Sequence, residues 1–300
     1  MEIKVRFGEE NGNDSSTEFV IKPGAIISVV GSSEKMDFIK KATLEAEKYD
    51  ILYHCTNDEA LLKIIESRAF HLTCLKEVND KEENNRITLP EYEKSYFVAC
   101  FTYENDVDYK HWDEYGTSDC GVLFSVKKEW FLRSASFVDD PKGYKIFPSS
   151  NAYYEEWEKS RYPISDAIQD FKFIKITYDD SLIIEMTGDA YMGGTKGSAV
   201  IPGIIGTIKK ESGPCERNGK TYIKSWKDEK EVRLITQILL PSIMQNPNRP
   251  YFQKISVPLS SDAFSDFHIR FSPRYPQTKK QNFIERIKEI LPDSTIKIMV

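Results

Sequence analysis

The sequence predicts an α+β protein whose core is a mixed, largely antiparallel sheet with flanking helices. Strand-like and helix-like stretches both occur, but they do not alternate in the regular order that a parallel α/β sheet requires. Short, strongly apolar runs at 95–103 (SYFVACFTY) and 121–126 (GVLFSV) are typical of buried strands. Residues 277–291 carry apolar side chains at helical spacing, which predicts a helix near the C-terminus.

The composition is that of a soluble globular protein with a packed core. The chain has 300 residues, of which 40% are hydrophobic and 12% aromatic, enough for one large domain or two small ones. The formal net charge is −6. Because phosphate binding is driven by Lys and Arg, this charge does not point to a nucleic-acid binder. We interpret short basic pairs such as Lys209-Lys210 as solvated surface.

The sequence also indicates a cytoplasmic protein. The N-terminus (MEIKVRFGEENG) lacks the basic segment and apolar run of a signal peptide. No stretch approaches the roughly 18 apolar residues of a membrane-spanning helix, so no membrane association is expected. The five cysteines are scattered and form no C-x-x-C motif, which fits reduced thiols. The histidines are equally scattered, and no metal is expected.

We predict two parts, an N-terminal extension of residues 1–48 and a core domain of residues 49–300. The extension is β-rich and ends in an amphipathic helix. Its expected strands are 2–7, 17–22 and 25–30, and its expected helix is 33–50, with Met36, Phe38 and Ile39 as candidate core positions.

The core domain is expected to begin with a strand, a helix and a second strand. Thr56 and Glu59 have the T-x-x-E spacing of a capping box, so Thr56 is expected to cap the helix. The expected elements are a strand at 51–54, a helix at 57–70, a strand at 69–75, a long polar functional loop at 76–94, strands at 95–103 and 121–126, and between these a short helix that ends near Gly116.

The second half of the chain is less regular. Residues 187–214 are rich in glycine and are expected to form a loop, without the spacing of a phosphate-binding motif. The other expected elements are a partly helical segment at 161–175 and strands at 181–186, 251–259, 266–272 and 295–300.

Four clusters of residues could carry chemistry, and the first two lie near the start of the core. Tyr53-His54-Cys55-Thr56 stands where a strand gives way to a helix, a common place for a ligand to meet the backbone. His54 could equally be a packed structural histidine. The second cluster is Asn79-Asp80 with Glu82 and Glu83, which could shape a site or be a solvated loop.

The other two clusters combine aromatic and charged residues. The third cluster is Asp106, Trp112, Tyr115 and Gly116, between two apolar strands. Trp112 and Tyr115 lie three residues apart, so they share a helix face and could bind a ligand or belong to the core. The fourth cluster is Trp226, Glu229, Glu231 and Arg233, and the last three are expected to alternate onto one face of a strand. That arrangement could be a site or only an edge-strand ion pair.

Taken in order, these motifs resemble a bacterial family known as domain-of-unknown-function family 2971. The residues that carry the resemblance are LYHCT, AFHLTCLKEVND, FVACFT, CGVLFSV and KSWKDEKEVRLI. They span roughly residues 51–126 and 224–235, and residues 1–48 lie outside the resemblance. That family in turn resembles the ADP-ribosyltransferase fold.

The resemblance implies an NAD-consuming enzyme and a role for each matched residue. His54 and Thr56, with Tyr53, would hold an NAD ribose, and Trp112 or Tyr115 would contact the nicotinamide. Glu231 would be the catalytic carboxylate, with Glu229 as the competing choice. Transferases of this fold often carry an arginine near the first strand; here the nearest is Arg68.

The residues themselves suit this chemistry. Breaking the nicotinamide bond of NAD builds positive charge on the ribose, and a positioned carboxylate stabilises that charge. A neutral histidine can donate one hydrogen bond and accept another, so His54 could fix a diol. Arg233 could bind a pyrophosphate or orient the glutamates. We expect a transferase or NAD glycohydrolase of bacterial toxin or antiphage type, with an unknown protein or nucleic-acid acceptor and a possible regulatory partner.

Two other hypotheses stay open. The chain could be a non-catalytic module that binds a nucleotide or a protein, which would be favoured if Glu229, Glu231 and Arg233 form a closed, buried ion-pair network. It could also be a hydrolase or nuclease in which Asp80, Glu83 and His54 hold Mg²⁺ or Mn²⁺.

Overall fold

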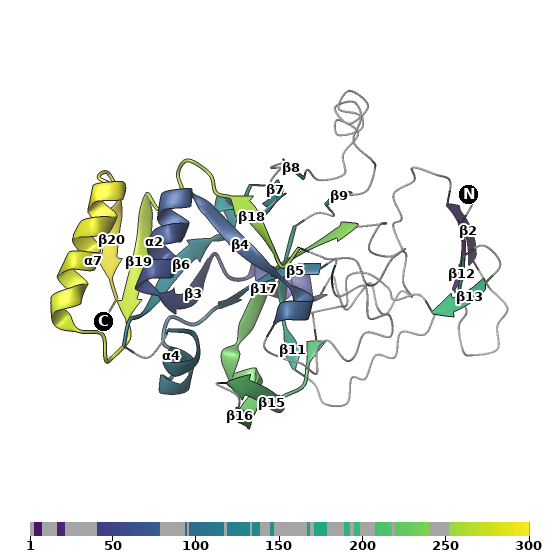
Figure 1. Cartoon of the computed structure of the whole chain (residues 1–300), viewed down its shortest axis with the longest axis horizontal. Coiled ribbons are helices and arrows are strands. Elements are labelled where there is room, and N and C mark those ends of the chain that lie inside the picture. Colours follow the sequence, from purple (N-terminus) through teal and green to yellow (C-terminus); the bar gives the residue numbers. More distant parts are fainter. Residues whose placement is uncertain are drawn as a thin grey trace.

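The α+β class is confirmed, with a largely antiparallel sheet and few helices (Figure 1). The computed structural model describes residues 3–7, 17–21, 41–78, 94, 96–116, 119–132, 134–138, 145–146, 167–168, 171–178, 189–192, 195–198, 208–217, 220–239 and 252–299. No helix within these residues is long and apolar enough to cross a membrane.

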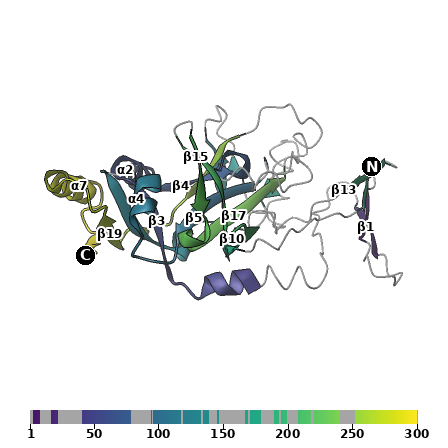
Figure 2. The same cartoon turned by 90° about the horizontal axis from the view of Figure 1, so that it is seen from below.

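The main sheet has twelve strands within the described residues, and nine of them follow one another in the order β20-β19-β6-β3-β5-β4-β18-β7-β8. The remaining three join through β17, which lies between β5 and β10 (Figure 2) and also pairs with β9. The strands are β3 (Ile51–Asn57), β4 (Ala69–Cys74), β5 (Tyr96–Thr102), β6 (Gly121–Lys127), β7 (Ala135–Phe137), β8 (Lys145–Ile146), β9 (Ala167–Ile168), β10 (Lys172–Lys175), β17 (Glu231–Leu239), β18 (Lys254–Pro258), β19 (Asp266–Phe271) and β20 (Thr295–Ile298).

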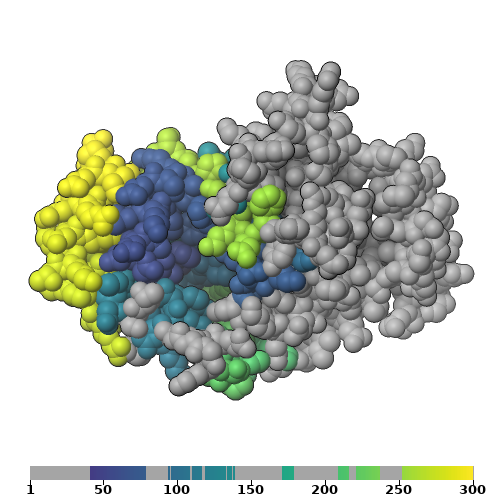
Figure 3. Space-filling model, viewed as in Figure 1, coloured from purple at the N-terminus to yellow at the C-terminus, as the bar shows by residue number. Residues whose placement is uncertain are grey.

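Helices cover both faces of this sheet. Leu61 and Ile65 of α2 (Asp58–Ser67) lie in one apolar core with Ile287 of α7 (Gln277–Ile290) and Phe124 of β6. The two helices lie side by side at the surface, α7 in yellow and α2 in blue (Figure 3). On the opposite face, Trp112 of α4 (Tyr109–Tyr115) packs against side chains of β3 and β6.

Two glycines let α4 lie close against β6. A side chain on Gly116, which follows α4, would come within 2.8 Å of the Cα of Gly121 and 2.9 Å of the carbonyl oxygen of Trp112. Such contacts are shorter than packed atoms tolerate, so both positions require glycine. The helix ends at Gly116, as the sequence predicts, and its last residue, Tyr115, is thereby held at a defined place beside the sheet.

The main sheet divides between β3 and β5. β3 pairs with β6 along its whole length, but it pairs with β5 only at Tyr53 and Thr102. β5 instead pairs with β17 from Thr102 to Tyr96. The two halves of the sheet therefore diverge beyond Tyr53 and leave a fork, which His54 enters from the β3 side.

The start of α2 differs from the prediction. Thr56 belongs to β3, and the N-cap is Asn57, whose side-chain oxygen accepts a 2.8 Å hydrogen bond from the backbone N–H of Ala60. The capping box predicted for Thr56 and Glu59 is therefore wrong. The strand continues three residues beyond the expected end at residue 54, because β3 stays paired with β6 as far as Asn57 and Gly121.

Two predictions for the middle of the chain are also wrong in the residues that the structure describes. The segment 161–175, expected to be partly helical, contributes β9 and β10, because both pair with β17. The segment 187–214, expected to be a loop, contains β12 (Asp189–Met192), β13 (Thr195–Ser198), β14 (Ile208–Lys209) and the start of β15 (Ser212–Arg217). Pairing with partners far away in the chain decides β9, β10 and β14, whereas β12 and β13 pair with each other close in the sequence. The predictions for 25–30, 33–40 and 181–186 lie outside the described residues.

The N-terminal strands belong to a second sheet. β1 (Ile3–Phe7) pairs with β2 (Thr17–Ile21) and with β12, in the order β13-β12-β1-β2. Half of this sheet thus comes from residues 189–198, within the part assigned to the core. The boundary at residue 48 remains a prediction.

Replacing the cap of α2 should destabilise the protein. Asn57→Ala is expected to lower the free energy of unfolding by about 1 kcal/mol, because the N–H of Ala60 loses its acceptor. Denaturant unfolding at neutral pH measures this. Thr56→Ala, one residue earlier, is the matched control and should cost clearly less; an equal or larger loss for the control would contradict the assignment of Asn57 as the cap.

Candidate functional site

A cavity of about 920 Å³ occupies the fork of the main sheet. Its walls come from β3, β4, β5 and β17 and from the helices α2 and α4. Sites for small molecules in proteins typically measure roughly 300–1,000 Å³, so this cavity is large enough for a cofactor-sized ligand. It is the natural candidate site within the described residues.

Most of the residues singled out from the sequence line this cavity. They are Tyr53, His54, Thr56, Tyr115, Glu229, Glu231 and Arg233. Trp112 does not: it is 3% exposed and packs against Tyr53 and Leu123. Of the two candidate aromatics, the structure therefore leaves Tyr115 at the cavity. Asn79, Asp80 and Glu83 lie outside the described residues, and Arg68 donates to the carbonyl oxygen of Ser261 rather than lining the cavity.

His54 spans the fork. Its Nδ1 lies 2.9 Å from the carbonyl oxygen of Cys100 on β5, an atom that can only accept, so Nδ1 carries the proton. Its ring packs among Phe70, Phe101 and Phe124. Burial among these rings lowers the pKa of His54 to about 4. At neutral pH the imidazole is uncharged, and its Nε2 is a hydrogen-bond acceptor.

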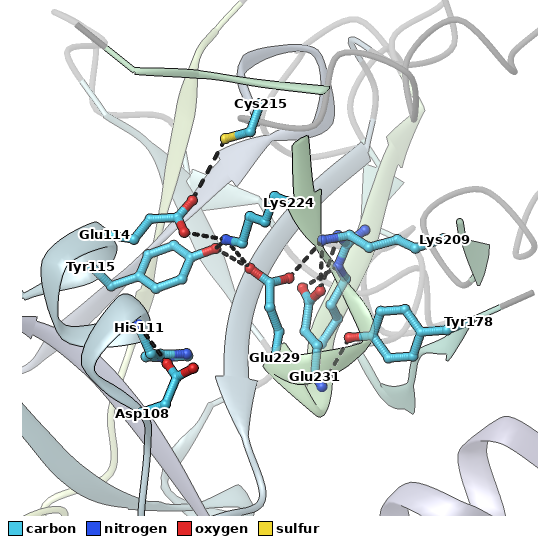
Figure 4. A network of polar contacts seen from close by, with 11 residues as sticks. Asp108, His111, Glu114, Tyr115, Tyr178, Lys209, Cys215, Lys224, Glu229 and Glu231 are labelled. Atoms are coloured by element: carbon cyan, nitrogen blue, oxygen red, sulfur yellow. Dashed lines mark hydrogen bonds and ion pairs between the residues drawn. The ribbon is translucent and has the colours of Figure 1, made fainter. Parts of the chain in front are cut away.

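Glu231 lies at the beginning of β17 and is 3% exposed. Its carboxylate accepts from Lys209 Nζ at 2.9 Å (Figure 4). It also accepts from Arg233 Nε at 2.6 Å. Burial by itself would raise the pKa of Glu231, but the charges of Arg233 and Lys209 hold that pKa far below its usual range. Glu231 is therefore ionised at any physiological pH.

Glu229 is the centre of a second group of contacts. One of its oxygens accepts from the Tyr115 hydroxyl and from Lys224 Nζ at 2.6 Å; the other is 3.1 Å from Lys209 Nζ. Burial opposes the charge of Glu229, but Lys209 and Lys224 lower its pKa nevertheless. Lys224 also pairs with Glu114 at 2.5 Å, which extends the network to α4 (Figure 4).

Trp226 supports both lysines from one side. Its indole is 1% exposed, and Lys209 Nζ and Lys224 Nζ lie 4.8 and 4.7 Å from its ring. A cation over an aromatic face is attracted by the ring quadrupole, most strongly when water is excluded. The ring therefore stabilises two ammonium groups that would otherwise be costly to bury.

A turn, not a strand, brings Glu229 beside Glu231. The sequence pattern predicted that both glutamates and Arg233 alternate on one strand, and this holds only for Glu231 and Arg233. Glu229 ends the 3₁₀ helix η4 (Lys227–Glu229), and Lys230 follows in the left-handed region with φ 48°. The reversal at Lys230 turns Glu229 back toward Lys209 and Tyr115.

Several residues of the site were missed from the sequence. Lys209 was interpreted as solvated surface, yet it is 3% exposed between two carboxylates, so that interpretation is wrong. The backbone N–H of Glu231 donates to the Tyr178 hydroxyl at 3.2 Å, and the ring of His111 lies 4.9 Å from that of Tyr115. No local pattern marks Lys209 or Tyr178, because their partners lie tens of positions away in the chain. Lys224 joins Glu229, five residues on, to Glu114 on a distant helix. The missed residues are His111, Glu114, Tyr178, Lys209 and Lys224.

No family model, curated protein or solved structure matches this chain. Within the described residues, no group of three or more His, Cys, Asp or Glu side chains is arranged to hold a metal ion. What the site offers is an ionised carboxylate, a neutral histidine with a free acceptor nitrogen and a tyrosine, all at one cavity. This set can bind hydroxyl groups and stabilise a positive charge.

The neutral state of the half-buried His54 predicts how the free energy of unfolding depends on pH. The folded protein protonates His54 only near pH 4, whereas the unfolded chain does so near pH 6.5, so the unfolded state binds more protons between these values. Lowering the pH from 7 to 5 should therefore reduce the free energy of unfolding, with His54 contributing on the order of 1–2 kcal/mol. Denaturant unfolding of wild type and His54→Gln at both pH values measures this; equal losses in the two proteins would refute it.

Proposed function

We propose that this chain is an NAD-consuming ADP-ribosyltransferase or NAD glycohydrolase. The observation that carries the proposal is the convergence of three residues on one cavity. His54 comes from β3, Tyr115 from α4 and Glu231 from β17, and all three line the cavity in the fork. The resemblance of the sequence motifs to the ADP-ribosyltransferase fold requires this convergence.

In the proposed reaction, the bond between nicotinamide and the ribose C1′ breaks, and its electron pair leaves with nicotinamide. Positive charge then develops on the ribose. Glu231, which is ionised and fixed by Arg233 and Lys209, stabilises that charge where it forms. An acceptor group or water attacks C1′ and releases a proton.

His54 and Tyr115 serve binding in this proposal. The Nε2 of His54 accepts a hydrogen bond from a ribose hydroxyl, because the ring proton is on Nδ1, which donates to the carbonyl oxygen of Cys100. Tyr115 provides an aromatic contact for the nicotinamide ring, and its hydroxyl is fixed by Glu229 and Lys224. Thr56 and Tyr53 lie beside His54 on the cavity wall.

The wider setting follows from the same proposal. We place the enzyme in the cytoplasm, as an effector of toxin or antiphage type that a partner protein would control. The acceptor would be a protein or a nucleic acid, or water in the case of a glycohydrolase. Five free cysteines among the described residues fit such a compartment.

One observation favours a second candidate, a non-catalytic module that binds a nucleotide or a protein. Glu229, Glu231 and Arg233 form a buried ion-pair network together with Lys209. A carboxylate already paired with two cations has less charge left for a substrate. The metal-dependent hydrolase with Asp80 and Glu83 has no such observation in its favour.

Nicotinamide release from NAD by the purified chain tests the proposal. Wild type should release nicotinamide, and Glu231→Gln should reduce the rate by about 10²–10³-fold, because the group that stabilises the developing charge is lost. His54→Ala should also lose activity, through weaker ribose binding. The matched control is Glu211→Gln, which changes a surface glutamate paired with Lys227 and should leave the rate unchanged.

An NAD-dependent thermal shift, measured on the same proteins, separates the alternatives. A shift without nicotinamide release would favour the binding module. If NAD causes no thermal shift and no nicotinamide is released, the proposal of an NAD-consuming enzyme is refuted.

A further inference from the structure

The side chain of Lys209 joins the two glutamates of the site. Its Nζ lies 3.1 Å from an oxygen of Glu229 and 2.9 Å from an oxygen of Glu231. We propose that Lys209 is a positioning residue that fixes the positions of these two carboxylates and directs Glu231 into the cavity. This inference rests on the proposed function, because it assigns to Lys209 a role in the same site.

The position of Lys209 is itself tightly determined. Lys209 belongs to β14, which pairs in parallel with β11 (Thr177–Tyr178), and it lies opposite Tyr178 in that pair. The Tyr178 hydroxyl accepts from the backbone N–H of Glu231. This short two-stranded unit therefore contacts Glu231 twice, at its side chain through Lys209 and at its backbone through Tyr178.

Lys209 also has little freedom to move away. Its side chain is 3% exposed, and its ammonium group lies over the ring of Trp226. An ammonium fixed by two carboxylates and an aromatic face is more rigid than the usual flexible lysine. Its placement can thus set the placement of both glutamates.

The need for a cation at this point follows from the charges. Two carboxylates that touch the same atom repel each other, and without a cation between them one takes up a proton at a higher pH than normal. Each glutamate also pairs with a second cation: Glu231 with Arg233, and Glu229 with Lys224. Other titratable groups that face the pair are Cys100, His111, Glu114, Tyr115 and Tyr178.

A purely structural lysine would give a different result from a positioning lysine. If Lys209 only helps to hold the fold, its loss lowers stability but leaves kcat and the pH profile of the reaction unchanged in the protein that stays folded. If it positions them, its loss raises the pKa of one glutamate and displaces the acid limb of the profile. The pH profile of the reaction therefore separates the two roles, and the titration of the carboxyl groups shows whether Lys209 keeps both glutamates ionised.

The experiment compares wild type with Lys209→Met and Lys209→Arg in the full chain. Carboxyl groups of ¹³C-labelled glutamate are titrated by NMR, and Glu229→Gln and Glu231→Gln assign the two signals. Lys209→Met should move one titration up by at least about one pH unit, and Lys209→Arg should restore most of it. Lys227→Met is the control, because that lysine pairs with Glu211 at the surface.

Nicotinamide release is measured as a function of pH on the same proteins. Lys209→Met should reduce kcat at pH 7 on the order of tenfold to a hundredfold, with the acid limb moved to higher pH and with Lys209→Arg rescuing it. An unchanged titration and pH profile in Lys209→Met would overturn the proposal. If wild type releases no nicotinamide, the proposed function fails, whereas the titration still shows whether Lys209 keeps both glutamates ionised.

A double variant covers the case in which Lys209→Met does not fold. The double variant Lys209→Met with Glu229→Gln leaves one carboxylate at this point. No second carboxylate then repels it, so no cation is needed to offset the repulsion. This protein should fold, and Glu231 should titrate as in wild type, because Arg233 remains beside it. Failure of the double variant to fold, or a Glu231 that is protonated at neutral pH, would overturn the proposal.

Discussion

The hydrogen bond from His54 to the carbonyl oxygen of Cys100 holds together the place where the main sheet divides. β3 and β5 pair at Tyr53 and Thr102 and then separate, so the backbone groups beyond that point need other partners. The imidazole supplies one of them at 2.9 Å. The same fork that removes the strand pairing leaves room for the cavity, so the site exists because the sheet is incomplete there.

The charges on one wall of this cavity balance. Lys209, Lys224 and Arg233 face Glu114, Glu229 and Glu231, and each of these ions has at least one partner of opposite sign. Burial of any one alone would be costly, and removing a single partner from such a network typically destabilises by roughly 3–5 kcal/mol. The network therefore behaves as a unit. It keeps Glu231 ionised, which the proposed chemistry needs, and it also withholds part of that charge from a ligand.

The short parallel pair of β11 and β14 has an importance beyond its size. It brings Tyr178 and Lys209 against the first residue of β17, and through them it fixes both the backbone and the side chain of Glu231. Gly116 and Gly121 do the same for the opposite wall, because they allow α4 to approach β6 and so place Tyr115. Two small local features thus align groups that lie on separate halves of the sheet.

The sequence by itself determined the α+β class and the strands around the fork, because apolar periodicity is a local signal. Clustered polar groups are also a local signal, and they marked the candidate site residues His54, Tyr115, Glu229, Glu231 and Arg233. It could not supply Lys209, Lys224 or Tyr178, whose roles depend on contacts between distant segments, and it misplaced the cap of α2 by one residue. Only the tertiary structure decided that the glutamates share a lysine and that Trp112 belongs to the core. Charge pairing and strand pairing across long stretches of chain act through space, and their partners are not neighbours in the sequence.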